Sequence, residues 1–215
     1  MTTTTAAATP PPASQHPTAQ PLPLQLPVAG REFFTDSPVP AAKKLLGSLL
    51  LWDNTLCLIA ETEAYSARGD AACHTARSPK SRAFLDSSPP GTCYVYLNYG
   101  MHWMLNFVVK SRNASGFVLI RALLPIWGKE LMLQRRGRLP LCSTPGRLTQ
   151  ALAITGRDHG CDICHTPGRG VLPRLVPAAI QSTPRIGISV ARDLPWRFVL
   201  RDPDLTHRKT LQALL

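Results

Sequence analysis

Apolar and polar residues alternate along the chain in short segments that predict strands and helices. A helix is expected to begin after a cap at Asp36 or Ser37 and to end at Gly47. Two apolar segments on either side of a polar turn, 49–52 and 55–65, predict a β-hairpin. Further strands are expected over 92–98, 102–109, 117–123, 186–190 and 196–200, and further helices over 126–136 and 146–154.

The order of these elements favours one fold class. Strands follow one another directly, without the alternating helices of a βαβ series, so we expect a mixed α+β domain around an antiparallel sheet. The segment 66–91 is rich in Gly, Ser, Pro and basic residues, which is typical of a long functional loop. We see no internal repeat.

The two ends of the chain differ from its middle in composition. Residues 1–30 contain no Lys, Arg, Asp or Glu and are rich in Thr, Ala and Pro, which predicts a disordered tail. A transit peptide is an alternative, although the Arg residues that such peptides use are missing. We therefore expect a folded domain over 31–205 and a short C-terminal tail over 206–215.

Composition and charge limit the kinds of partner that the chain is expected to bind. The hydrophobic content of 44% is sufficient for a core, and the net charge of +11 favours a polyanionic partner, either nucleic acid or an anionic membrane. Arg outnumbers Lys, which favours nucleic acid. No apolar run reaches the roughly 18–20 residues that cross a bilayer, and no secretory signal is visible. Six unevenly spaced cysteines then predict reduced thiols and a cytoplasmic location.

Two acidic residues stand out in the second predicted strand. Side chains alternate along a strand, so Ile59, Glu61, Glu63 and Tyr65 are expected to share one face. Two carboxylates this close raise the pKa of one of them, as burial would, and a carboxylate of raised pKa can take a proton from water. The alternative is a solvated strand end whose acids pair with Arg.

A basic residue lies inside an apolar strand. Arg121 lies within the segment 116–125, and a buried guanidinium costs several kcal/mol unless it meets an anion. Glu61 or Glu63 is the expected partner. A purely structural ion pair is the alternative.

All four tyrosines of the chain fall between residues 65 and 99. Tyr94 and Tyr96 are expected on one strand face, where they could stack on an extruded base. Tyr99 lies in a predicted hairpin tip, where a large ring is poorly placed for core packing and well placed to wedge between base pairs. Ordinary β-propensity also explains tyrosines in strands.

A cluster of cysteine and histidine side chains is the remaining motif. Residues 159–165 read HGCDICH, which matches the pattern of haem c attachment, and His159 adds a metal-ligand candidate. Haem attachment normally needs export, and zinc would need further ligands such as Cys142 or His74. We therefore expect no metal and no cofactor, and interpret the motif as a chance cluster of thiols in a loop.

Six segments together resemble the alkyladenine (3-methyladenine, or methylpurine) DNA glycosylases. They occur in that family's order and span most of the chain. They are FFTDSPVPAAKKLLG at 33–47, AETEAY at 60–65, AACH at 71–74, GTCYVYLNYGMHWMLN at 91–106, VLIRALLP at 118–125 and PGRLTQALAI at 145–154. The resemblance implies a single α+β domain built on a curved antiparallel β-sheet, with flanking helices and a protruding β-hairpin.

The resemblance also implies a reaction. Glu63 occupies the place of the family's general base, which deprotonates the attacking water, and Arg121 that of an arginine that helps to hold the water and the nucleotide backbone. Tyr99 matches the wedge that fills the gap in the duplex, with Met101 beside it. The enzyme would be a monofunctional hydrolase without lyase activity, would need no metal, and would release alkylated or deaminated purines by base flipping.

The same resemblance assigns the walls of a base pocket. Tyr65, His74 and Tyr96 match residues that enclose the flipped base. Asn106 matches the residue that discourages undamaged guanine, and Leu119 is expected to line the pocket. The partner is then double-stranded DNA with damaged purines, bound by a monomer in the bacterial cytoplasm or nucleoid, or in a eukaryotic nucleus.

Three hypotheses remain open from the sequence. The first is this glycosylase, and the second is a protein that binds distorted DNA without cutting it. The third is a redox or metal protein built on Cys161 and Cys164. Thr144, where many relatives have Gly, and His102-Trp103 depart from the family pattern and leave the range of lesions open.

Overall fold

The computed structural model describes residues 27–214, and the N-terminal part of the expected tail, 1–26, lies outside the described residues. The folded domain includes residues before Arg31. Ala29 is buried, and its backbone N–H donates to the carbonyl oxygen of Val171 at 2.7 Å. The last residues of the expected tail 27–30 thus pack against the sheet.

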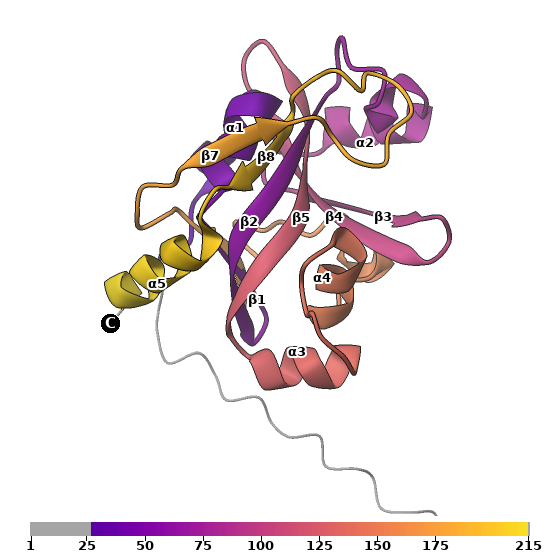
Figure 1. Cartoon of the computed structure of the whole chain (residues 1–215). Coiled ribbons are helices and arrows are strands. Elements are labelled where there is room, and N and C mark those ends of the chain that lie inside the picture. Colours follow the sequence, from indigo (N-terminus) through magenta and orange to yellow (C-terminus); the bar gives the residue numbers. More distant parts are fainter. Residues whose placement is uncertain (1–26, 215) are drawn as a thin grey trace, which may run out of the picture.

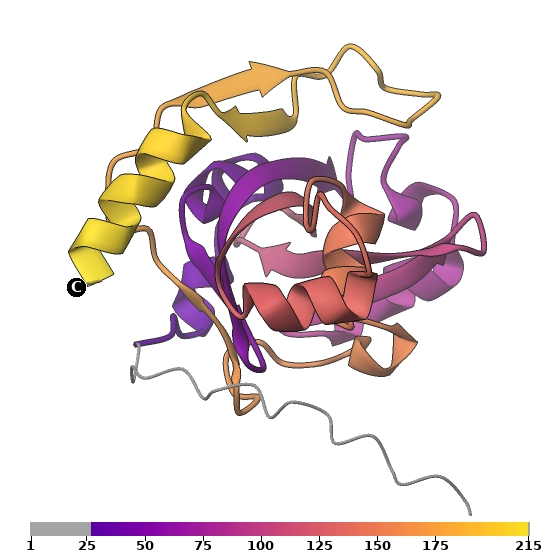
Figure 2. The same ribbon diagram turned by 60° about the horizontal axis from the view of Figure 1, so that its bottom comes forward.

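The molecule is built on one antiparallel sheet of eight strands, shown in Figure 1. Six strands follow the order β3-β4-β5-β2-β1-β6, β8 pairs with β2, and β7 pairs with β8. The strands are β1 (Leu49–Trp52), β2 (Thr55–Ser66), β3 (Cys93–Asn98), β4 (His102–Lys110), β5 (Ser115–Trp127), β6 (Arg169–Leu172), β7 (Ile180–Thr183) and β8 (Arg197–Leu200). The prediction of an α+β domain on a curved antiparallel sheet is confirmed, and Figure 2 shows the sheet curled into an open half-barrel.

The two longest strands, β2 and β5, form the middle of the sheet and carry irregular pairing. Their register shifts between Ile59 and Glu61 and again between Glu61 and Thr62. Such bulges bend a strand and re-aim its side chains. Ile59 packs in the main core, whereas Glu61 and Glu63 form ion pairs with Arg121.

Short helices cover the sheet and supply the rest of the main core. They are α1 (Pro38–Leu45), α2 (Pro79–Ser87), α3 (Lys129–Arg136), α4 (Pro145–Ala151) and α5 (Pro203–Leu214), with 3₁₀ turns η1 (Arg31–Phe34), η2 (His74–Ala76) and η3 (Gly156–Asp158). Residues of α1 and α4 bury against β1, β2 and β4 in one apolar cluster. The α1 and α4 predictions are confirmed to within a few residues.

Four predicted elements differ from the structure. The segment 66–91 contains α2, whose N-cap Ser78 accepts a hydrogen bond from the backbone N–H of Ser81. The helix expected from residue 126 begins at Lys129, because β5 continues to Trp127 and Gly128 turns the backbone with a positive φ of 77°.

The other two differences concern the C-terminal part. Residues 186–190 form a loop, and the actual strand lies earlier, at β7. Residues 206–214, expected as a tail, belong to α5. Its start is fixed by Pro203 and by Asp202, whose carboxylate accepts from the backbone N–H of Leu205 at 2.9 Å.

A second, smaller apolar cluster lies at the end of the sheet near α2. It contains Leu85, Val108, Cys73, Tyr94 and Phe117. Tyr65 and Tyr96 pack against it from outside. This cluster fixes the aromatic rings that surround the site described next.

Candidate active site

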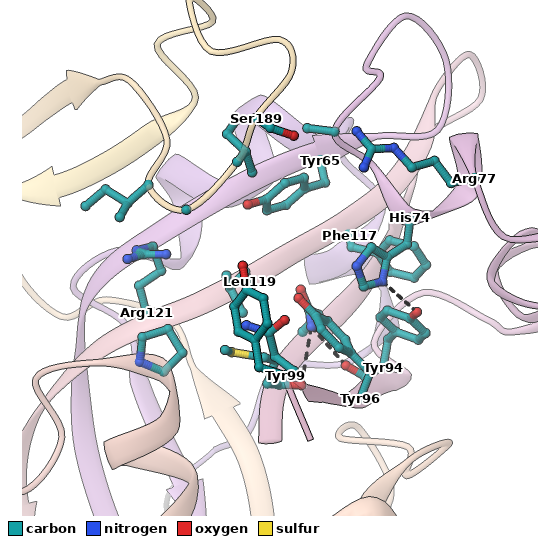
Figure 3. Close-up of a pocket in the computed structure, with 18 of the residues that line it drawn as sticks. Tyr65, His74, Arg77, Tyr94, Tyr96, Tyr99, Phe117, Leu119, Arg121 and Ser189 are labelled. Atoms are coloured by element: carbon teal, nitrogen blue, oxygen red, sulfur yellow. Dashed lines mark hydrogen bonds between the residues drawn. The ribbon is translucent and has the colours of Figure 1, made fainter. Parts of the chain in front are cut away.

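A cavity of about 400 Å³ opens beside the middle of β2 and β5. Its walls come from these strands, from the segment around η2, from the β3–β4 hairpin and from the loop 186–190. Figure 3 shows Tyr65 and Ser189 at the top of the view, His74 at the right, Arg121 at the left, and Tyr99 next to Tyr96 at the bottom. The volume is within the range typical of small-molecule sites.

Glu63 lies directly behind the wall of this cavity and has no exposed surface. The Tyr65 hydroxyl donates to its Oε2 at 2.7 Å, and the backbone N–H of Ile186 donates to its Oε1 at 2.8 Å. Arg121 Nη1 lies 3.3 Å from the same Oε1. Because Tyr65, Arg121 and Ile186 all line the cavity, a single layer of groups separates the carboxylate from the open space.

An ionised carboxylate can accept about four hydrogen bonds. Three donors already meet Glu63, which leaves one acceptor position for a further group such as water. Burial raises the pKa of the Tyr65 phenol, and the adjacent charge of Glu63 raises it further, so Tyr65 stays a neutral donor. Glu63 is thus held as an acceptor with defined orientation.

A second carboxylate completes an ion-pair network around Arg121. Glu61 Oε1 accepts from Arg121 Nε at 2.7 Å and from Arg197 Nε at 2.5 Å. Burial opposes the charge of Glu61, but the hydrogen bonds from the two arginines outweigh it and lower the pKa of that carboxyl. Burial likewise opposes the charge of Arg121, and the carboxylates of Glu63 and Glu61 outweigh it and raise its pKa.

The prediction that an acid of β2 is the partner of Arg121 is confirmed, and both acids take part. They have different surroundings. Glu61 is held between two cations, whereas Glu63 shares one cation and accepts from a phenol and a backbone amide.

The predicted aromatic residues converge on the cavity. The His74 and Tyr96 rings lie 4.3 Å apart between centroids, and Tyr94 lies beside both. Burial lowers the pKa of His74, and the nearby charge of Arg77 lowers it further, so its ring is uncharged at neutral pH. Tyr65 lines the cavity from β2. Aromatic rings from β2, η2 and β3 therefore form part of the cavity wall.

Asn106 and Leu119 are register partners on β4 and β5 and form part of the cavity lining. The Asn106 side-chain amide donates to the backbone carbonyl oxygen of Tyr94 at 3.1 Å, so its orientation is fixed. Tyr94 is in turn held by His74 and Ser81, whose side chains lie 2.9 Å and 2.8 Å from its hydroxyl.

The β3–β4 hairpin ends in a tight turn, as predicted. Tyr99 has a φ of 50° and Gly100 a φ of 67°, and the Met101 N–H donates to the Asn98 carbonyl at 3.0 Å. Positive φ at both central positions suits the twist of a hairpin. For a tyrosine this conformation costs roughly 1–2 kcal/mol. The Tyr99 side chain is 81% exposed and reaches the mouth of the cavity.

Met101 is separated from the other predicted site residues. It is 68% exposed and borders a different hollow on the other side of the hairpin, together with Arg135, Arg136 and Arg138. The hairpin therefore carries one aromatic ring toward the cavity and one thioether toward a basic surface.

The motif at 159–165 does not form a joint site. His159 accepts from the backbone N–H of Val95 and packs against Phe84, whereas Cys161 points to Arg169. The Cys164 sulfur lies close to Gly91. Among residues 27–214, no group of three or more His, Cys, Asp or Glu side chains is placed to hold a metal ion.

Two functional features were missed at the sequence level. The first is Arg197, which lies between Trp196 and Phe198; the signal that singled out Arg121, a basic residue in an apolar strand, would have found it. The second is the loop 186–190 with the preceding Arg185, which no local pattern marks.

Arg185 is fully buried together with Asp70, and the two side chains form a bidentate pair at 2.6 and 2.8 Å. The Arg185 guanidinium also lies 4.7 Å from the Tyr65 ring centroid. It thus holds the start of the loop whose first residue, Ile186, donates to Glu63.

No helix in the described part of the chain is long and apolar enough to cross a membrane.

Comparison with known proteins adds independent evidence. A family model described as Methylpurine-DNA glycosylase (MPG) matches residues 32–204. A protein of Nitrosospira multiformis, named provisionally as a 3-methyladenine DNA glycosylase, is 43% identical over 171 residues, which cover 78% of this chain and 87% of the relative. A protein of Rhodopseudomonas palustris with the same name is 42% identical over 187 residues, 85% of this chain and 91% of the relative.

Proposed function

Because the chain belongs to the methylpurine-DNA glycosylase family, we propose that it hydrolyses the N-glycosidic bond of alkylated or deaminated purines in double-stranded DNA by base flipping. It is a DNA glycosylase, a hydrolase that acts in the repair of damaged DNA bases. The observation that carries the detailed proposal is the position of Glu63 behind Tyr65 and Arg121, at the back of an aromatic cavity.

The aromatic walls suit a damaged purine. A base alkylated on a ring nitrogen carries positive charge, and aromatic faces attract cations by about 0.5–2 kcal/mol each. Tyr65, His74 and Tyr96 would enclose such a base. Because His74 is uncharged at neutral pH, it would not repel a cationic ring.

The acid at the back suits bond cleavage. Departure of the purine builds positive charge on the sugar, and the Glu63 carboxylate would steady that charge and take a proton from the attacking water. Arg121 would hold the water and the nucleotide backbone. No lysine lines the cavity in the part of the chain that the structure describes. We therefore infer hydrolysis without a covalent lyase step.

The enclosure of Glu63 adds one requirement to this mechanism. The water must pass the layer formed by Tyr65, Arg121 and Ile186. Ile186 is half exposed and belongs to a loop, whereas the other two residues belong to central strands. We infer that the loop 186–190 moves by about the width of one water molecule when a nucleotide enters.

The proposal is tested with duplexes that each carry one lesion, chosen from 3-methyladenine, 7-methylguanine, hypoxanthine and ethenoadenine. Purified protein is expected to release the free base from at least one and to leave an intact abasic site, which alkali converts to a strand break. A break that forms without alkali would contradict the monofunctional mechanism.

The enclosure of Glu63 also supports a second candidate, a protein that binds distorted DNA without cutting it. In that case Glu63 would be structural, and the cavity would only hold the base. Tight binding to all four lesions with no free base released under any condition would favour this candidate over the hydrolase.

The hairpin tip leads to a prediction about DNA binding. Tyr99→Gly is expected to weaken binding to lesion DNA at least tenfold, because the ring that fills the gap in the duplex is lost. The same change should leave the domain as stable or slightly more stable, because glycine adopts the positive φ of this position without cost. Fluorescence anisotropy and thermal unfolding measure the two effects, and unchanged affinity would remove Tyr99 from the interface.

The basic hollow beyond the hairpin leads to a prediction about salt. Arg138 is exposed at its border, and we expect it to contact a DNA phosphate. Arg138→Ala should weaken binding to all sequences equally and reduce the slope of log Kd against log salt concentration by about 1. Arg112, an exposed arginine outside this hollow, gives the matched control Arg112→Ala, which should leave the slope unchanged.

A further inference from the structure

Cys161 lies outside the glycosylase site, at a separate hollow of about 570 Å³ bordered by η3, Asp53 and Arg169. It is partly exposed, whereas Cys93, on the first position of β3, is fully buried beside it. The backbone N–H of Cys93 donates to the carbonyl oxygen of Cys161 at 2.8 Å, and the backbone N–H of Gly160 donates to the carbonyl oxygen of Cys93 at 2.9 Å. The backbones of the two cysteines are therefore paired, and one cysteine is partly exposed while the other is buried.

The surroundings of the Cys161 sulfur favour its ionised form. Arg169 Nη1 lies 3.4 Å from Sγ, and the Thr166 hydroxyl is hydrogen-bonded to it at 3.3 Å. Asp53 and Asp158 also face this side, but both form ion pairs with the same Arg169, which fixes the guanidinium next to the sulfur.

The pKa values of the cysteines agree with this geometry. The Cys93 hydrogen bond, opposed by burial and assisted by Thr166 and Arg169, lowers the pKa of Cys161 to about 6. The hydrogen bond to Cys161, together with burial, raises the pKa of Cys93. Cys164, three residues along the same loop and also partly exposed, has its pKa raised to about 11 by burial and by Asp162.

We propose that Cys161 is a peroxide-reactive thiolate and that Cys93 is the thiol that resolves its oxidised form as a disulfide. In the first step the Cys161 sulfur attacks one oxygen of hydrogen peroxide. The O–O bond breaks, the sulfur loses two electrons and becomes a sulfenic acid, and the second oxygen leaves as hydroxide. In the second step the Cys93 sulfur attacks the Cys161 sulfur, the S–O bond breaks, and the hydroxyl leaves as water with the Cys93 proton.

This site is independent of the proposed base excision, because neither cysteine lines the aromatic cavity. The disulfide would join β3 to the loop that follows η3. Tyr94 follows Cys93 directly in the chain, and it is the residue that fixes His74 and Asn106. The disulfide would therefore form next to Tyr94, the residue that holds two side chains of the base pocket in place.

The first experiment compares Cys161 with Cys164 in the unmodified full-length protein. Each is alkylated with iodoacetamide over pH 5–9, and the labelled peptides are quantified by mass spectrometry with fragmentation to tell the two apart. At pH 7 we expect Cys161 to react at least tenfold faster, because its larger thiolate fraction outweighs its lower intrinsic nucleophilicity. Its rate should reach half its maximum near pH 6. Equal rates, or a faster Cys164, would overturn the proposal.

The second experiment adds hydrogen peroxide to the same protein. We expect loss of two hydrogen atoms per chain and a peptide pair crosslinked through Cys93 and Cys161, both reversed by a dithiol reductant. Cys164→Ser should behave identically, and Cys161→Ser should give no crosslink. In Cys93→Ser a sulfenic acid at Cys161 should be trapped by dimedone. A crosslink that uses another cysteine, or no crosslink while Cys161 oxidises further, would contradict the role of Cys93.

Discussion

Glu63→Gln is expected to lower the rate of base release by about 10²–10⁴-fold, the usual contribution of a positioned general base. The amide oxygen can still accept from Ile186 and Arg121, and the Tyr65 hydroxyl can turn to accept from the new amide group. The fold should therefore tolerate the change, while the group that takes the proton is lost. Single-turnover release of 3-methyladenine from a defined duplex measures the effect.

Two further measurements make this result specific. Thermal unfolding shows whether the glutamine disturbs the ion-pair network, and binding to a duplex with an abasic-site analogue shows whether the DNA interface is intact. We expect both to be close to those of the unmodified protein. If the variant releases the base at more than a tenth of the rate of the unmodified protein, with any lesion, Glu63 is not the general base.

Asp70→Asn is expected to reduce the free energy of unfolding by about 3–5 kcal/mol, because it leaves the fully buried charge of Arg185 without its partner. For a domain of this size the midpoint of thermal unfolding should fall by roughly 6–20 °C. The surface pair of Asp36 and Lys44 provides the matched control. Asp36→Asn should change stability by at most about 1 kcal/mol.

The same substitution should also affect catalysis in preparations that remain folded. Arg185 lies against Tyr65 and directly precedes Ile186, and both of these residues donate to Glu63. We expect a lower rate of base release at 20 °C, where the variant is still folded. An Asp70→Asn protein as stable as the Asp36→Asn protein would show that Arg185 finds sufficient partners in the backbone carbonyls of Ala64 and Ala191.

The local pattern was sufficient to predict the central sheet. The apolar segments that became β1 to β5 and the turn at Tyr99 each carry their own signal, namely alternation, flanking turn residues or a glycine. The ion pairs of Arg121 with the acids of β2 could be predicted because an unpaired buried charge is costly. That cost does not depend on where the strand lies in the sheet.

Features that depend on long-range contacts could not be predicted in this way. A bulge near Ala60 interrupts the regular pairing of β2 with β5, although the residue pattern of β2 continues without a break. The segment 186–190 has the apolar alternation of a strand, but it lies over Glu63 as a loop, anchored by the ion pair of Arg185 with Asp70 more than a hundred residues away. Its conformation is fixed by those contacts and not by its own sequence.

The position of this loop in the chain has a consequence for synthesis. Glu63, Tyr65 and Arg121 leave the ribosome well before residues 185–190, which complete the enclosure of the acid. A nascent chain that ends before Arg185 would present Glu63 and Asp70 to water, each without a donor that the mature domain provides. The geometry that would confer reactivity is therefore assembled only after residues 185–190 have been translated.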